Sequence, residues 1–240
     1  LKMAPAHSEM TAAGAVWGNS WDLEVPLYFA PQGFAETPSL KRSNAFDIVG
    51  GECRAVRENV GLLDITGFSR FEVSGPNAEA WLNSVFATKL PAPGRARLAV
   101  ALGHDGRLKG DLTLFNWGDG TWWIMGSYYL RRWHMRWFDD HMQDGVTIRD
   151  LCEEMAGFSL SGPNSRAVIE RLTDGPVGDL CFMGCGNFDI GLIRAKVGRL
   201  SVTGEAGYEI SCRMGDHIAL RRMLLEAGAD KVSVNSAAVA

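Results

Sequence analysis

Glu209 is the first residue whose type and setting could do chemistry. It lies in Arg199-Leu-Ser-Val-Thr-Gly-Glu-Ala-Gly-Tyr-Glu-Ile-Ser211, which reads as two extended runs joined by a glycine-containing turn. In a regular strand its neighbours Tyr208 and Ile210 point to one face, and the carboxylate points to the other. Such a carboxylate can bind the N–H groups of a ligand. Strand carboxylates are more often solvated, so Glu209 alone leaves both interpretations open.

Asp111 is the second candidate. It follows Gly110 at the start of a segment in which Leu112 and Leu114 alternate with polar residues, as in a strand with one buried face. A carboxylate there can accept a proton or stabilise a developing positive charge. An aspartate next to a glycine more often marks a turn, and the residue by itself does not decide between these roles.

An internal repeat indicates how the chain positions these residues. Phe71-Glu-Val-Ser-Gly-Pro-Asn-Ala-Glu-Ala80 matches Phe158-Ser-Leu-Ser-Gly-Pro-Asn-Ser-Arg-Ala167 at an offset of 87 residues. Each copy predicts a strand, a turn at Gly-Pro and a helix with proline in its first turn. The predicted fold class is therefore α+β, with two similar small halves, each an α/β sandwich.

The periodicity predicts further elements around this repeat. Strands are expected over 97–103, 108–117, 122–125, 155–161, 188–193, 195–202 and 208–212, and helices over 52–60, from Pro76 to Phe86, and over 127–142, 163–172 and 216–227. The first 45 residues are irregular and rich in aromatic residues, and we expect them to pack as an arm over the globular body.

Composition excludes several classes of protein. The 240 residues are 46% hydrophobic and 22% charged, with a net charge of −4 and no cluster of basic residues, so neither a disordered chain nor a nucleic-acid partner is expected. No apolar stretch approaches the roughly 18–20 residues that span a bilayer, so no membrane association is expected. The absence of an apolar leader favours a cytoplasmic location, or the mitochondrial matrix in a eukaryote.

The cysteines do not suggest a metal site. Five are present, and only Cys181 and Cys185 are close in sequence, with no second Cys or His pair at a matching spacing. We expect reduced thiols and no metal. His134 and His141, on a tryptophan-rich segment without a His-Glu-x-x-His pattern, are interpreted as packing residues.

Several motifs together resemble the folate-binding aminomethyltransferase family, which includes the T-protein of the glycine cleavage system. Thr203-Gly-Glu-Ala-Gly-Tyr-Glu-Ile210 resembles the folate-contacting hairpin of that family, and Gly106-Arg-Leu-Lys-Gly-Asp-Leu-Thr-Leu-Phe115 resembles its Gly-x-x-x-x-Asp-Leu/Ile-Thr-Val run. The resemblance is closest to the folate domains of dimethylglycine and sarcosine dehydrogenases. It extends to Pro26-Leu-Tyr-Phe29, Glu52-Cys-Arg-Ala-Val-Arg-Glu58 and Gly61-Leu-Leu-Asp-Ile65, and covers about residues 14–230.

The resemblance implies roles for these residues. Glu209 would hold the pterin ring, and Asp111 would be the catalytic residue beside the reacting nitrogen of the folate. Positions implied to line the folate site are Leu98, Thr113, Gly126, Val202 and Tyr208. The implied cofactor is tetrahydrofolate, with FAD only on a separate or missing domain. The implied partners are folate, a small amine substrate and a flavin dehydrogenase domain or subunit.

The implied function is capture of a methylene group from a demethylated amine of the dimethylglycine or sarcosine type, giving 5,10-methylene-tetrahydrofolate. Whether the chain turns over as an enzyme stays open, with an aminomethyltransferase favoured. The alternatives are a truncated folate-binding module without turnover, and a tetrahydrofolate-dependent O- or S-demethylase.

The chain also departs from the family pattern. Val202 and Leu98 stand where the glycine-cleavage enzymes have tyrosines, and Gly126 stands where they have asparagine. No Gly-x-Gly-x-x-Gly fingerprint of a flavin domain occurs, and the family's C-terminal barrel is expected to be absent. The predicted division is an arm at 1–45, a first half at 46–150, a second half at 151–230, and a disordered or non-family tail at 231–240.

Overall fold

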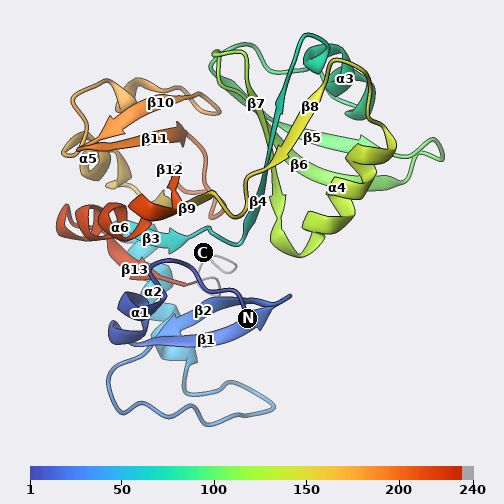
Figure 1. Cartoon of the computed structure of the whole chain (residues 1–240). Helices are drawn as coiled ribbons and strands as arrows, with labels where there is room; N and C mark the ends of the chain where they lie inside the picture. The colour runs from blue at the N-terminus through green and yellow to red at the C-terminus, as the bar shows by residue number, and fades with distance from the viewer. Residues whose placement is uncertain (234–240) are drawn as a thin grey trace.

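The structure, a computed structural model, describes residues 1–233. Two β-sheets stand side by side, and a small hairpin lies below them (Figure 1). The five-stranded sheet consists, in spatial order, of β5 (Arg95–Leu102), β6 (Leu108–Asn116), β7 (Trp122–Ser127), β4 (Phe68–Ser74) and β8 (Thr147–Asp150). All its neighbouring strands are antiparallel.

The six-stranded sheet forms the other half of the molecule. Its strands, in spatial order, are β10 (Cys185–Ile190), β11 (Ile193–Gly198), β12 (Gly207–Arg213), β9 (Met155–Ser161), β3 (Gly61–Asp64) and β13 (Asp230–Val232). Only β13 and β3 are parallel. The predicted boundaries of the halves are therefore corrected at both ends. The residues of β3 belong to the sheet of the second half, and residues 231–232 of the predicted tail are part of a strand. The rest of that tail lies outside the described residues.

Helices cover the outer face of each sheet, because the alternating apolar residues of the strands need a partner layer. On the five-stranded sheet, α3 (Ala78–Val85) and α4 (Arg131–Asp140) close a core around Phe71, Trp81 and Phe138. On the six-stranded sheet, α5 (Ser165–Glu170) and α6 (His217–Glu226) close a second core around Phe158 and Ile210. Within residues 1–233 no helix is long and apolar enough to cross a membrane.

The repeat seen in the sequence has a structural counterpart. Strand β4 and helix α3 begin at Phe68 and Ala78, and β9 and α5 begin at Met155 and Ser165, so both pairs differ by the same 87 residues. The shared Ser-Gly-Pro-Asn turn needs its glycine in both copies. Gly75 and Gly162 have φ values of +110° and +136°, and a Cβ at either position would lie within 2.4 Å of a backbone carbonyl oxygen.

The N-terminal arm has regular structure, which corrects the expectation of an irregular segment. It contains α1 (His7–Ala12) and the hairpin β1 (Ala15–Ser20)–β2 (Leu23–Phe29), and α2 (Phe46–Glu58) follows after a long loop. Met10 and Phe29 are buried, and Ile218 of α6 packs against their cluster. Arg221 and Arg222 of α6 also pair with Glu9. The arm is thereby fixed to the second half of the molecule.

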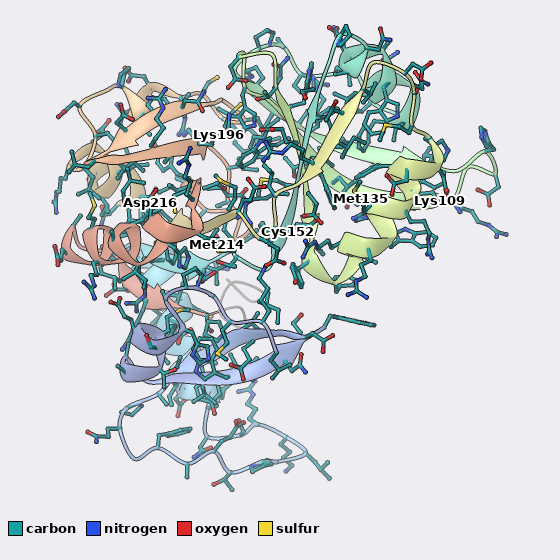
Figure 2. All side chains as sticks on the ribbon, viewed as in Figure 1. Lys109, Met135, Cys152, Lys196, Met214 and Asp216 are labelled. Carbon is teal, nitrogen blue, oxygen red and sulfur yellow. The ribbon has the colours of Figure 1, made fainter. Side chains whose placement is uncertain are left out.

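An apolar cluster joins the inner faces of the two halves. Phe115, Trp123 and Met125 of the first sheet are buried in it together with Cys185 of the second. Lys196 of β11, which Figure 2 shows between the two halves, adds an ionic contact. Its Nζ lies 4.5 Å from the centre of the Trp117 ring and 3.3 Å from Asp119 Oδ2. The two halves are therefore packed against each other through a cluster that is separate from the core of either half.

Candidate functional site

A cavity of about 280 Å³ opens between the two halves and contains both carboxylates singled out in the sequence. The first half contributes residues from β4, β5, β6 and β7, namely Phe68, Leu98, Asp111, Leu112, Thr113, Met125, Gly126 and Ser127. The second half contributes Glu209 from β12 and three residues of the preceding loop, Leu200, Ser201 and Val202. Residues far apart in the sequence thus meet in one cavity, which has largely apolar walls and two carboxylates.

Asp111 is placed by the pairing of β5 with β6. Leu112 and Leu114 enter the core under α3 and α4, so the side chains of Asp111 and Thr113 lie on the opposite face of the strand. Leu98 is directly opposite Thr113 in the neighbouring strand, and Val100 is opposite Asp111. Asp111 is exposed, whereas Leu112 beside it is buried. The strand therefore presents a solvated carboxylate at the rim of the cavity.

Glu209 contrasts with Asp111 because it is buried, with 6% of its surface exposed. It is flanked across the sheet by small residues, Ser159 on β9 and Gly198 on β11. No hydrogen bond from another described residue reaches its carboxylate. Burial raises the pKa of Glu209 to about 7, and the positive charge of Arg70 opposes part of that rise. The residue is therefore a carboxylate with unused acceptor capacity inside the protein.

Arg70 is a buried cation near the site that the sequence did not single out. It is fully buried, and its guanidinium donates to Ser211 Oγ at 3.2 Å and to the carbonyl oxygens of Phe68 and Ile65 at 2.9 Å and 3.1 Å. The bond to Ser211 joins β4 to β12. Ser211 lies two residues after Glu209 in that strand and therefore on the same face. Nothing in the local sequence around Phe71 distinguishes this arginine from a solvated one.

The loop that precedes Glu209 differs from its prediction. A strand was expected to continue to Val202, but β11 ends at Gly198, and residues 199–206 leave the sheet. The departure occurs where the chain packs closely, since a Cβ at Gly198 would lie 2.7 Å from the Phe115 ring and 2.8 Å from Leu200. The hydroxyl of Ser201 donates to the Glu205 carbonyl oxygen at 2.6 Å and fixes the loop. This turn is what brings Leu200, Ser201 and Val202 to the cavity.

One of the residues implied as folate contacts needs correction. Tyr208 is 1% exposed and lies in the core under α5 and α6, outside the cavity lining, because it alternates with Glu209 along the strand. Gly126 lines the cavity as predicted, and a Cβ at this position would lie 2.3 Å from Leu112. Leu98, Thr113 and Val202 do line the cavity. Phe68 and Met125 are lining residues that sequence reasoning missed, because their neighbours in the cavity are distant in the chain.

Comparison with known proteins gives the family of this fold. The family model described as the GCVT N-terminal domain matches residues 6–238. The chain therefore belongs to this family. A crystal structure of the glycine cleavage system aminomethyltransferase T from Bartonella henselae superposes with a TM-score of 0.83 at 21% identity, over 99% of this chain and 61% of that one. The fold is therefore the α+β fold of the aminomethyltransferases.

Two curated relatives are similar at the level of sequence. Dimethylglycine dehydrogenase, mitochondrial, of Mus musculus is 27% identical over 216 residues, which cover 88% of this chain and 25% of that protein. Aminomethyltransferase of Geobacillus kaustophilus is 28% identical over 232 residues, which cover 95% of this chain and 59% of the relative. The chain thus spans a quarter of the first relative and somewhat more than half of the second.

Proposed function

We propose that this chain binds tetrahydrofolate and takes part in one-carbon transfer, capturing a methylene group from a demethylated amine of the dimethylglycine or sarcosine type to give 5,10-methylene-tetrahydrofolate. The observation that carries the proposal is the meeting of Asp111 and Glu209, from different halves, in one cavity. Membership of the GCVT family and the similarity to a dimethylglycine dehydrogenase support it.

The cavity fits the ring end of tetrahydrofolate. A pterin presents a ring N–H and an exocyclic amino group side by side, and the buried carboxylate of Glu209 can accept a hydrogen bond from each. The apolar walls, including Phe68, Leu98 and Met125, suit the faces of a flat ring. A volume of about 280 Å³ suits the ring system, so we place the tail of the cofactor outside the cavity.

Asp111 is the proposed catalytic residue. Bound tetrahydrofolate supplies the nucleophilic nitrogen that receives the one-carbon unit. The carboxylate of Asp111 faces the same cavity from the opposite half, where it can stabilise a cationic donor and accept the proton released as the nitrogen forms its new bond. Holding both reactants in a shared cavity lowers the entropic part of the barrier.

We also propose a flavin dehydrogenase domain or subunit as the partner. Converting a methylated amine to an electrophilic iminium removes a pair of electrons from the amine, and a flavin is suited to accept them. The mouse relative is a dimethylglycine dehydrogenase, and this similarity supports such a partner. In this arrangement the partner oxidises the amine, and the present chain captures the carbon.

The role of Glu209 is tested by substitution with glutamine. An amide keeps the shape but offers one acceptor and adds a donor, so Glu209→Gln should weaken tetrahydrofolate binding by at least about 30-fold. Anaerobic isothermal titration calorimetry measures this. Glu205→Gln, in the same loop but outside the cavity lining, is the matched control and should bind normally. Equal affinity of wild type and Glu209→Gln would contradict the assignment of the pterin anchor.

The role of Asp111 is tested by separating binding from transfer. Asp111→Asn should retain tetrahydrofolate affinity but reduce the transfer rate by about 10²–10⁴-fold, because the amide cannot accept the proton. The assay follows 5,10-methylene-tetrahydrofolate formed from dimethylglycine or sarcosine with a flavin dehydrogenase added, and exposed Asp105→Asn is the control. Undiminished transfer by Asp111→Asn would refute the catalytic role. Binding by wild type without any product would favour a module without turnover.

A further inference from the structure

A second and larger cavity, of about 670 Å³, lies in the N-terminal arm, away from the cavity lined by Asp111 and Glu209, which we call the folate-site candidate. We call it the arm cavity. It is enclosed by β2, by the start of α2 and by the long loop of residues 30–45 that connects them, at the bottom of Figure 1. It shares no lining residue with the cavity of Asp111 and Glu209.

The loop over the arm cavity is held in a defined shape. The backbone N–H of Thr37 donates to Asn44 Oδ1 at 2.8 Å, and Asn44 Nδ2 donates to the Ala35 carbonyl oxygen at 3.0 Å. The hydroxyl of buried Tyr28 donates to Glu36 Oε2 at 2.7 Å and ties the loop to strand β2. The cavity is therefore a preformed feature, as in compact loops packed by their own side chains.

The electrostatics of the arm cavity favour an anion. Its one lining carboxylate, Glu36, is engaged by the hydroxyls of Ser43 and Tyr28, which lower the pKa of Glu36. Lys41 and Arg42 also line the cavity, and among the described residues no carboxylate lies within ion-pair distance of either one. Hydrogen bonds from neutral hydroxyls keep Glu36 ionised, so the lining carries two positive charges and one negative charge, and the balance is positive.

The apolar lining of the arm cavity indicates that the ligand also has an apolar part. Leu27 and Val49 line the interior, and Phe46 is 51% exposed at its edge. The Arg42 guanidinium stacks 4.3 Å from the centre of the Phe46 ring, an arrangement that leaves its N–H edge available to an anionic oxygen. We propose that the arm cavity binds a small aromatic anion, with its ring against Leu27, Phe46 and Val49 and its charge beside Lys41 and Arg42.

The test uses 8-anilinonaphthalene-1-sulfonate as the probe, because it combines a flat apolar body with one negative charge and fluoresces when bound. The intact chain should bind it at a saturable site, and the double variant Lys41→Gln/Arg42→Gln should bind about 10-fold more weakly. Lys89→Gln, which removes an exposed lysine elsewhere, should bind like wild type. Equal affinity of the double variant and wild type would overturn the proposal.

A pair of cavity-filling variants distinguishes the two cavities. Val49→Trp fills the arm cavity and should abolish probe binding, whereas Val202→Trp fills the folate-site candidate and should leave probe binding unchanged. The reverse result would place the probe in the other cavity and overturn the proposal.

Cys53 provides a reporter that needs no variant. It lines the arm cavity, so bound probe should slow its alkylation by iodoacetamide relative to exposed Cys181, as measured by peptide mass spectrometry. Equal slowing of both cysteines, or of neither, would contradict binding at this place.

Discussion

At the scale of single residues, Glu209 shows a conflict between stability and binding. A carboxylate with 6% exposure loses most of its hydration, and this raises its pKa to about 7. The same burial makes it a strong and selective acceptor for a ligand with adjacent N–H groups. Asp111, exposed on a neighbouring wall, stays hydrated. The two carboxylates are thus placed in environments that suit different tasks.

The raised pKa predicts a pH dependence of binding. Accepting two N–H bonds requires the ionised form of Glu209, so affinity for tetrahydrofolate should rise with pH and level off above about pH 7. The dissociation constant should be about 10-fold larger at pH 6 than at pH 8. Calorimetric titrations at both pH values measure this. Glu209→Gln should show no such dependence, and an equally steep dependence in that variant would assign the titration to another group.

The raised pKa of Glu209 also predicts that substituting this residue by glutamine increases the stability of the fold. The folded protein holds the Glu209 proton up to about pH 7, whereas the unfolded chain releases it near pH 4.5. The free energy of unfolding of wild type should therefore fall as pH rises through this window, by about 3 kcal/mol from this group. Glu209→Gln lacks this loss and should be the more stable protein at pH 8, with little difference at pH 4. Urea unfolding at the two pH values tests it, and identical pH profiles would argue against a buried, protonated Glu209.

At the scale of elements, one carboxylate ties the arm to the second sheet. Glu52 of α2 is 7% exposed and accepts hydrogen bonds from the backbone N–H groups of Phe29 and Ser233, at 2.7 Å and 2.9 Å. These residues end β2 and follow β13. The helix thereby joins two strands that lie at opposite ends of the sequence.

Removing this connection should destabilise the fold. Glu52→Ala removes a buried carboxylate that accepts from two backbone N–H groups, and we expect a cost of about 2–4 kcal/mol in the free energy of unfolding. Glu58→Ala, an exposed substitution on the same helix, should change stability by less than about 0.5 kcal/mol. Chemical denaturation compares the two. A Glu52→Ala protein as stable as Glu58→Ala would show that water replaces the lost acceptor.

At the scale of the whole molecule, the folate-site candidate depends on how the halves meet. Leu200 and Met125, from opposite halves, both belong to the apolar cluster between the sheets and both line the cavity. Trp123 is 1% exposed in the same cluster. Packing between the halves and the shape of the cavity are therefore determined together.

Two tryptophan substitutions distinguish an effect on the stability of the fold from an effect on the shape of the folate-site candidate. Trp123→Ala and Trp81→Ala should each cost about 3–5 kcal/mol, because both side chains are buried, but Trp81 lies in the core of the first half alone. At matched fractions of folded protein, Trp123→Ala should bind tetrahydrofolate far more weakly than Trp81→Ala. Equal affinities of the two variants would indicate that the cavity does not depend on the interface.

Local pattern predicted much of the fold. The Ser-Gly-Pro-Asn turns, with glycines that need positive φ, mark both repeated strand–helix units, and β9 runs over residues 155–161 as the alternation predicts. The packing of the arm on the globular body was predicted, but its hairpin was missed because the strands have no regular alternation. Strand β3 was placed in the wrong half because a short apolar run carries no information about its partner. Pairing of β3 with β9 is a contact between residues about a hundred positions apart.

The sequence by itself determined the family resemblance, the repeated unit and the two acidic candidates, since these depend on residue types at short spacing. Only the tertiary structure decided that Asp111 and Glu209 line one cavity, that Tyr208 is turned into the core and that Arg70 lies buried beside the site. The physical reason is that a side chain's burial and partners depend on which strands pair and which faces meet. Those contacts form between segments whose separation along the chain leaves no local signal.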